Sequence, residues 1–281
     1  SLGHGGAEHQ LALLAGRLQG WGVANLVAYL HPPAYLEEEL RTVGVPAVCL
    51  GVRGKPLWPL AVARLRRLLR AWRPHLLHTS LFDADVVGGV AARLAGVPAV
   101  STLTNIAYEP ERLVDNRHVT PWKLALARAL HRATLRRCHR HHVAISRYVK
   151  ASAVRDLGLE PGRVSVVYRG LPPGWLEPPR ADGLAGRLGV EGAYPLLLAV
   201  GRLVPQKGHR YLIAALPRVA ARFPRARLLL VGEGPLREEL AAQARRLGVE
   251  DRVRFLGRRE DVRALLALSH VFVFPSLFEG L

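Results

Sequence analysis

The sequence is poor in several features that would place it in a particular class. It contains no methionine and only two cysteines, and no apolar run in it reaches the roughly 18 residues that a membrane-spanning helix requires. Cys49 and Cys138 do not suggest a disulfide framework, which favours a reducing compartment. The opening residues "SLGHGGAEHQ" lack the basic start and apolar stretch of a secretory signal. We therefore expect a cytoplasmic protein without a spanning helix. The absence of methionine, even at position 1, also indicates a fragment.

Lysine is scarce in a strongly basic chain. Of the 40 basic residues only four are Lys, and the formal net charge is +18. Residues 1–172 hold 23 basic and 11 acidic residues, against 17 and 11 in residues 173–281. This excess fits either an Arg-rich solvated surface or a basic face that meets an anionic partner. Zinc-finger spacings, RNA-binding aromatic signatures and helix-turn-helix patterns are missing, so a membrane surface or polyphosphate fits better than nucleic acid.

Short apolar segments alternate with helical ones along most of the chain. This alternation predicts a parallel sheet with helices on both faces. The expected strands of the first half are 23–30, 45–52, 75–80, 97–104, 141–146 and 164–168.

Prolines and glycines interrupt this alternation once. Residues 173–194 read as a linker between a first domain, 1–172, and a second, 195–281. In the second domain Pro217 is expected to kink or interrupt a helix over 207–223, and Pro235 to start the next one. The four strands expected there are 195–201, 226–232, 251–257 and 270–275.

The first domain raises a question of completeness. Its glycine loop "GHGGAEH" already begins at Gly3, before any strand that would lead into it. The first strand of a doubly wound sheet is usually central, and its loss would leave neighbouring strands unpaired. We therefore expect the first strand to be missing from this sequence and the second domain to be incomplete.

Two cations follow one predicted strand in "VGRLVPQKGH", which runs from Val200 to His209. The strand should end at Gly201 and place Arg202 at its carboxyl end, where ligands bind in open parallel sheets. Lys207 follows at a helix start, so two cations and a helix N-terminus would converge on an anion such as a diphosphate. The alternative is a pair of solvated basic residues. The scarcity of Lys favours the anion site.

Two glycine loops give weaker indications. In "GEGPLREEL" (232–240), Gly232 and Gly234 allow close backbone approach, although such glycines often serve geometry alone. In the opening loop, the N–H groups of Gly5 and Gly6 would face a phosphate or sugar. That loop matches neither the P-loop nor the dinucleotide fingerprint, so a nicotinamide cofactor is not supported.

Two polar clusters have competing interpretations. "RRCHRHH" (136–142) contains metal-binding residue types, but it spans a helix end and a strand start, where side chains diverge. We favour a solvated basic surface there and predict no metal site. "HTSLFDAD" (78–85) would either reach a ligand at the strand end or cap a helix through Asp83.

With these residues assembled, the chain resembles retaining glycosyltransferases of family 4. The resemblance covers essentially the whole chain and is strongest over 195–281, where "GRLVPQKGH", "VGEGPL", "VRFLG" and "FPSLFEGL" follow the family's order and spacing. "GHGGAE" resembles the family's first glycine loop, and "AISRYVKASAVRDLG" followed by "VSVVYRG" resembles the end of its first domain. The resemblance implies the α/β GT-B fold, in which two Rossmann-like domains face a central cleft.

The resemblance also implies roles for individual residues. Arg202 and Lys207 would hold the donor's diphosphate and stabilise the leaving group in place of a metal ion. Glu279 would be the first Glu of the family's Glu-x7-Glu motif and bind donor-sugar hydroxyls, while the second Glu would lie past Leu281. No cofactor or metal is expected. The implied donor-binding residues are Gly5, Gly6, Gly201, Gly234, Leu256 and Arg258.

Two positions depart from the family pattern. Thr104 stands where many relatives have a His that contacts the cleft, and Asn105 is the substitute contact we consider. Arg169 stands where the family usually has Asn.

The implied activity is transfer of a hexose from a UDP- or GDP-sugar, with retention, to a lipid-linked, membrane-associated or polysaccharide-precursor acceptor. The basic first domain would face anionic lipid on the inner side of the membrane. Alternatives are a nucleotide-sugar epimerase of the same fold, and a non-catalytic basic module that binds membrane or nucleic acid. We expect residues 1–281 alone to be inactive.

Overall fold

The computed structural model describes residues 2–3, 5–105, 108, 120–172, 174–177, 179 and 182–280. These residues fall into two compact units. The first comprises the described residues up to 172 together with Gly280, and the second comprises those from 174 to 279.

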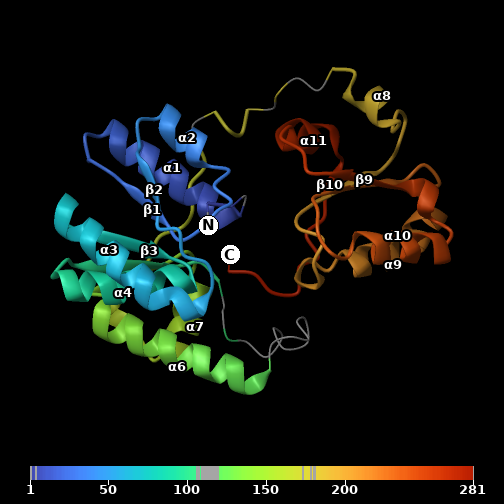
Figure 1. Cartoon of the computed structure of the whole chain (residues 1–281). Helices are drawn as coiled ribbons and strands as arrows, with labels where there is room; N and C mark the ends of the chain where they lie inside the picture. Colours follow the sequence, from blue (N-terminus) through green and yellow to red (C-terminus); the bar gives the residue numbers. More distant parts are fainter. Residues whose placement is uncertain are drawn as a thin grey trace. The chain divides into compact units, whose positions relative to one another are not determined.

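The first unit alternates helices and short strands (Figure 1). Its helices are α1 (Gly6–Gly20), α2 (Glu37–Thr42), α3 (Trp58–Trp72), α4 (Phe82–Ala95), α6 (Pro121–Cys138) and α7 (Arg147–Leu157), with short 3₁₀ turns at Lys55–Leu57 and Pro161–Arg163. Its strands are β1 (Val27–Tyr29), β2 (Ala47–Cys49), β3 (Leu77–Ser80), β4 (Ala99–Leu103), β5 (His141–Ala144) and β6 (Val164–Val166).

All strand pairs of the first unit are parallel. They form a two-stranded sheet, β1-β2, and a four-stranded sheet in the order β3-β4-β5-β6. Helix α4 packs between α3 and α6, and the three lie side by side in Figure 1. One apolar cluster lies between α3, α4 and the start of β4, and another between α1, α2 and the β1-β2 sheet. Helix α4 is buried around most of its circumference over residues 85–92, whereas α3 buries one face and leaves the other toward solvent.

The second unit repeats the alternation around one sheet. Its strands are β7 (Leu196–Val200), β8 (Arg227–Val231), β9 (Val253–Gly257) and β10 (Val271–Phe272), all parallel and in the order β10-β7-β8-β9. Its helices are α8 (Leu184–Leu188), α9 (His209–Arg222), α10 (Arg237–Arg246) and α11 (Val262–Leu268), with 3₁₀ turns at Pro205–Lys207 and Glu250–Arg252.

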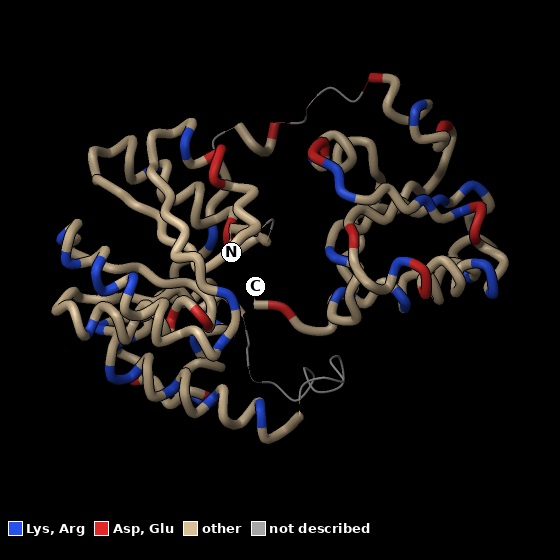
Figure 2. The backbone as a smooth tube through the Cα atoms, in the orientation of Figure 1, with Lys and Arg blue, Asp and Glu red and all other residues tan. Residues whose placement is uncertain are grey.

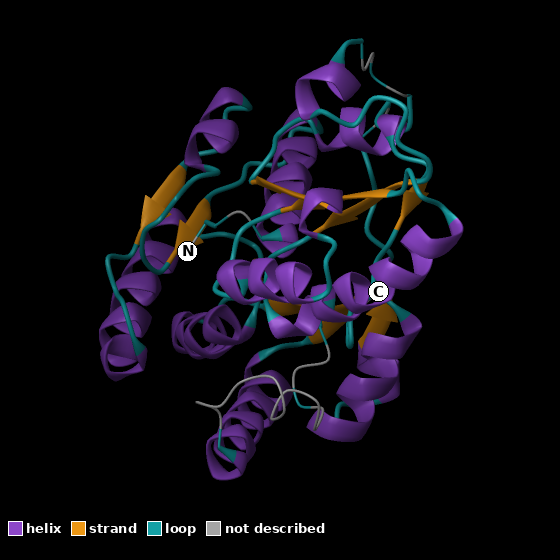
Figure 3. Ribbon diagram, turned by 90° about the vertical axis from the view of Figure 1, so that its right-hand side faces the viewer, coloured by secondary structure: helices purple, strands orange, loops and turns teal. Residues whose placement is uncertain are grey.

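Alternate residues of each central strand in the second unit enter different cores. Leu228 and Leu230 of β8 pack with residues of α9 and α10, whereas Leu229 and Val231 pack with residues of α8 and α11. Both faces of the sheet are thus covered by helices, as Figure 3 shows. This explains why β7 and β8 are almost uniformly apolar in sequence.

The alternating pattern correctly predicted the order and parallel pairing of the elements, although the strands are shorter than the apolar runs. Two details differ. Helix α9 continues through Pro217, which removes one backbone donor without ending the helix. Helix α10 begins at Arg237, so Pro235 lies in the preceding turn. Across the described residues, none of the helices combines the length and apolar character needed to cross a bilayer.

Candidate functional site

The predicted site residues of the second unit lie along one edge of its sheet. Because the strands are parallel, the loops that follow them all leave at the carboxyl edge. Arg202 follows β7, Gly234 follows β8 and Arg258 follows β9. Gly201 is the residue after β7, and Leu256 lies inside β9, partly buried against the apolar core. The fold therefore brings this set together, as the motif order predicts.

The loops after β7 and β8 are held against each other by backbone contacts. Leu203 donates its N–H to the Glu233 carbonyl at 2.8 Å, and its own carbonyl accepts from Leu236 N–H at 3.1 Å. A methyl group on Gly234 would collide with the Leu203 backbone, and one on Gly232 would collide with the Gly201 carbonyl. Both glycines therefore serve close packing of the two loops, which fixes the position of Arg202.

The segment after β10 is fastened to the loop after β7. Gln206 donates its side-chain N–H to the Phe278 carbonyl at 2.9 Å, and its own carbonyl accepts from Leu277 N–H at 2.8 Å. A side chain at Gly208 would meet the Pro275 carbonyl. The pairing of β10 with β7 makes this possible, because it places their carboxyl ends next to each other. This contact positions the chain just before Glu279.

Lys207 and Glu279 form an ion pair at this edge. The Lys207 ammonium donates to Glu279 Oε1, and it also lies over the Phe274 ring, 4.9 Å from its centroid. The side chains are 17% and 27% exposed, so the pair is partly shielded but reachable. Arg202 is exposed, and no ion pair joins it to another described residue. The sequence predicted a separate ligand for each of Lys207 and Glu279, and the structure adds that they bind each other.

His209 is a neighbour that sequence reasoning missed. Its side chain is 4% exposed, and neither ring nitrogen has a hydrogen bond of good geometry to another described residue. Burial lowers the pKa of His209, and the Lys207 charge adds to this, although the backbone of Gly201 and Arg202 beside the ring opposes it. His209 is therefore a buried imidazole beside the backbone of Gly201 and Arg202 and within range of the Lys207 charge. The His stands within the "VGRLVPQKGH" motif, but only its burial distinguishes it from a surface residue.

The predicted site residues of the first unit form their own group. Gly5 is the N-cap of α1 and Gly6 its first residue. A methyl group on Gly5 would meet the Glu8 carboxylate, and one on Gly6 would lie 3.6 Å from Arg169 Nη1. Burial lowers the pKa of Arg169, and the nearby Glu8 carboxylate opposes that effect. The start of α1 is thus bordered by one acid and one guanidinium.

Asn105 is the remaining predicted contact. It is exposed and follows β4, so it lies at the carboxyl edge of the first unit's larger sheet. The prediction that this edge faces the second unit's site across a cleft stays a prediction.

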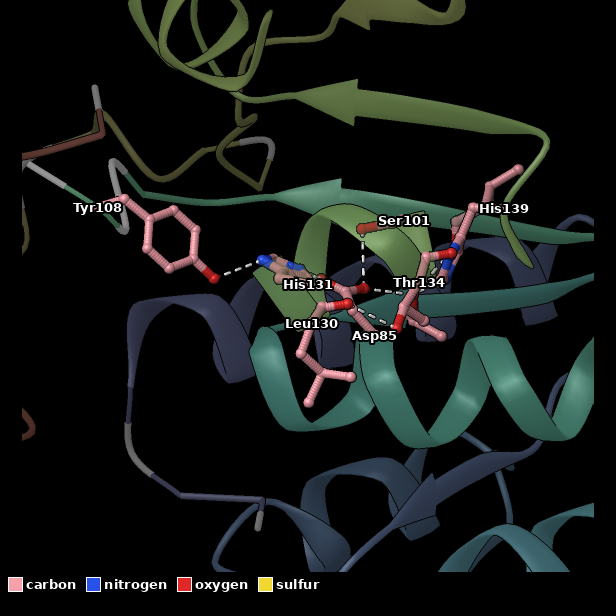
Figure 4. Close-up of polar contacts among 9 residues, drawn as sticks. Asp85, Ser101, Tyr108, Leu130, His131, Thr134 and His139 are labelled. Carbon is pink, nitrogen blue, oxygen red and sulfur yellow. Dashed lines mark hydrogen bonds and ion pairs between the residues drawn. The ribbon is translucent and has the colours of Figure 1, made fainter. Parts of the chain in front are cut away.

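A buried polar cluster joins α4, α6 and two strands of the first unit (Figure 4). The carboxylate of Asp85, 1% exposed, accepts from the hydroxyls of Thr79 and Ser101 at 2.5 and 2.8 Å. Its other oxygen pairs with His131 Nε2 at 3.0 Å, and His131 Nδ1 meets the Tyr108 hydroxyl at 2.8 Å. This network ties the inner face of α6 to the sheet.

The two polar clusters noted in the sequence therefore have structural roles. Asp83 does not cap α4, whose N-cap is Leu81 without a side-chain bond, and Asp85 is the buried acid instead. In the 136–142 run, His139 Nε2 meets the Thr79 hydroxyl at 3.0 Å, while His141 Nε2 meets the Ser165 hydroxyl at 2.8 Å. The expected solvated surface is wrong for His139 and His142, which are 2% and 1% exposed. Among the described residues, no group of three or more metal-ligand side chains comes together.

His142 shows how strongly this interior disfavours charge. Burial, with smaller contributions from His139 and Arg163, lowers its pKa to about 4. Within the described part of the chain, its Nδ1 atom has no hydrogen-bond partner. Cys49 and Cys138 are both free thiols, and burial raises the pKa of Cys138.

The carboxyl edge of the second unit has the chemistry of an anion site with an adjacent acceptor of hydroxyl hydrogen bonds. A guanidinium and an ammonium offer charge-assisted hydrogen bonds to phosphate oxygens. A carboxylate beside them is acceptor-only, which suits the hydroxyls of a sugar. A Cβ atom at Gly201 would lie 3.5 Å from the Lys207 side chain, so the stem of that side chain lies against the backbone at the end of β7.

Family comparisons agree over both units. Residues 4–174 match the family described as Glycosyltransferase Family 4, and residues 194–281 match the one described as Glycosyl transferases group 1.

Individual relatives extend the match over most of the chain. The UDP-Gal:alpha-D-GlcNAc-diphosphoundecaprenol alpha-1,3-galactosyltransferase of Escherichia coli is 27% identical over 88% of this chain and 63% of the relative. The 2-deoxystreptamine N-acetyl-D-glucosaminyltransferase of Streptomyces fradiae is 30% identical, over 99% of this chain and 70% of the relative. The crystal structure of Anabaena HepE in complex with UDP-glucose superposes with a TM-score of 0.77 at 26% identity, over 98% of this chain and 72% of that one. This chain therefore spans less than two thirds of the E. coli relative's length.

Proposed function

Starting from the premise that this chain belongs to glycosyltransferase family 4 and has the GT-B fold, we propose that it transfers a hexose from a nucleotide sugar to an acceptor. The donor is a UDP- or GDP-sugar, and the acceptor is a lipid-linked saccharide or polysaccharide precursor at the membrane. The anomeric configuration of the donor is retained in the product.

The observation that carries this proposal is the Lys207–Glu279 ion pair at the sheet edge where Arg202 also lies. Arg202 and Lys207 lie in the loop after β7, and Glu279 follows the neighbouring strand β10. Arg202 is exposed with its guanidinium unpaired among the described residues, whereas Lys207 and Glu279 form an ion pair. In the proposed complex, Arg202 and Lys207 bind the diphosphate, and Glu279 accepts hydrogen bonds from sugar hydroxyls. The Lys207–Glu279 pair holds both side chains in place before the donor arrives.

In the proposed reaction, negative charge develops on the donor's diphosphate as it leaves. The bond between the anomeric carbon and the diphosphate oxygen breaks, and both electrons leave with the diphosphate. The acceptor oxygen bonds to the anomeric carbon on the same face, and its proton passes to the departing diphosphate. Arg202 and Lys207 stabilise the developing negative charge, which is the role that a metal ion has in other transferases.

The names of two relatives support the proposed classes of substrate. The Anabaena structure holds UDP-glucose, and the E. coli relative is named for UDP-galactose and a diphosphoundecaprenol-linked acceptor. We propose substrates of the same chemical classes here, together with a peripheral position on the cytoplasmic side of the membrane.

Product analysis tests this proposal. The full-length protein is incubated with UDP-glucose or GDP-mannose and a sugar diphospholipid acceptor, and the products are followed by nuclear magnetic resonance. We expect a glycosylated acceptor with the donor's anomeric configuration, and at least about a hundredfold slower transfer after Arg202→Ala or Lys207→Ala. Donor epimerised without acceptor would instead identify an epimerase. Unchanged turnover in both variants would show that the site is misassigned.

A further inference from the structure

Helix α6 has an outward face that is both apolar and bordered by cations. Trp122, Leu126 and Leu130 follow one another at intervals of four residues and are 64%, 62% and 40% exposed. Residues one turn apart lie on the same side of a helix, so these side chains form a stripe. Ala125 and Ala129 are exposed between them. We call these five residues the α6 stripe.

The opposite side of α6 is already occupied. His131, Thr134 and Leu135 are 5%, 5% and 0% exposed, and α6 packs on α4 and α7. His131 is also held by the buried Asp85 carboxylate. The buried side of α6 therefore packs on the rest of the first unit, and the α6 stripe lies on the opposite, exposed side of the helix.

The charges on α6 are of one sign. The helix is 18 residues long and its sequence contains no Asp or Glu. Its five cations are all exposed. Helical spacing puts Lys123, Arg128 and Arg132 beside the stripe, and Arg136 and Arg137 follow it toward the end of the helix. Figure 2 shows these basic positions spread along the helix. Exposed Trp and Leu side chains among exposed cations, on a helix without acidic residues, are features of helices that lie in the headgroup region of a bilayer.

We propose that the α6 stripe binds the surface of an anionic lipid bilayer, with the flanking cations on lipid headgroups. A second copy of the chain fits this face poorly, because it would bring the same five cations against each other. The proposal rests on the membrane acceptor proposed above and names the surface through which this protein reaches it.

The direction of α6 supports this role. The helix follows β4 and leads into β5, which is parallel to β4, so it starts at the carboxyl edge of that sheet. Trp122, at the start of α6, thus belongs to the same edge as Asn105, the predicted contact of the first unit. Insertion of the α6 stripe would hold this edge next to the lipid.

Vesicle flotation tests the proposal. The protein is mixed with vesicles of phosphatidylcholine alone or of phosphatidylcholine with phosphatidylglycerol. We expect binding to the anionic vesicles only. Leu126→Glu or Trp122→Ala should lower the partition coefficient about tenfold or more, because each change removes apolar area that would enter the bilayer. Leu247→Glu is the matched control, since Leu247 is a 40% exposed leucine at the end of α10, and it should bind like the wild type.

Three outcomes would overturn the proposal: no binding by the wild type, equal loss in the Leu247→Glu control, or full binding by both stripe variants. Saturation with an acidic peptide in place of vesicles would assign the face to a protein partner and also overturn it. Titration with UDP-glucose separates this proposal from the proposed function, because the Leu126→Glu variant should bind the nucleotide sugar as the wild type does. Thermal unfolding of each variant confirms that its fold is intact.

Discussion

At the scale of single residues, the site depends on glycines as much as on charges. Gly234 lies so close to the Leu203 backbone that a methyl group cannot be added without movement, although its own backbone conformation is an ordinary one. Gly20, at the end of α1, has open space around its Cα. The two positions therefore offer a test of whether close packing of the loops, rather than glycine's flexibility, is what Gly234 provides.

We predict that Gly234→Ala destabilises the second unit by about 1–3 kcal/mol, since overpacking forces the loop after β7 to shift. Gly20→Ala should leave stability unchanged or slightly raised, because alanine favours helix. Urea unfolding measures both. Equal stability of the two variants would mean that the loops are not in the close contact described.

At the scale of elements, the placement of α6 depends on a buried polar network. Asp85 pairs with His131, which lies 46 residues later in the sequence, and no local sequence pattern predicts this pair. In the sequence "FDAD" only Ala84 separates Asp83 from Asp85, and no feature of the sequence distinguishes the buried acid from the exposed one. Asp85 is the buried acid because α4 packs against the sheet on that side, where the hydroxyls of Thr79 and Ser101 donate to its carboxylate.

We predict that Asp85→Ala destabilises the first unit by about 3–5 kcal/mol, because it leaves a buried imidazole and two hydroxyls without their acceptor. Asp83→Ala removes an exposed acid from the same helical turn, so its effect should stay within about 0.5 kcal/mol. Chemical unfolding followed by circular dichroism compares them. A cluster without structural importance would give the two variants the same midpoint.

The helices and strands could be predicted, because apolar residues recur in the sequence with the period of each element. The runs at 195–201 and 226–232 contain the fully covered strands β7 and β8, and the breaks between segments fall at glycine and proline. The prediction that Pro217 interrupts its helix was wrong. Helix α9 continues through it, because a helix packed on a sheet tolerates the loss of one backbone hydrogen bond.

At the scale of the whole molecule, the sequence predicted which residues gather at an edge but not how they pair. The parallel pattern predicted Arg202 and Lys207 at one strand end, the family resemblance added Glu279, and the strand order places all three at the same sheet edge. The Lys207–Glu279 ion pair joins residues 72 apart and depends on β10 lying directly beside β7, which no single motif reveals. The exposed stripe of α6 was likewise hidden, because its alternation resembles that of a core-facing helix.

The central claim is that Arg202 and Lys207 form the diphosphate site of a nucleotide-sugar donor. Calorimetric titration of the protein with UDP-glucose and GDP-mannose tests it most directly. Arg222 provides the control, since it is exposed at the last turn of α9, away from the carboxyl edge. We predict saturable binding of one donor that weakens about tenfold or more in Arg202→Ala, and further in Lys207→Ala, which also leaves Glu279 unpaired. Arg222→Ala should bind as the wild type does. Absence of saturable binding to either donor, or equal affinity in the Arg202 and Arg222 variants, would contradict the account.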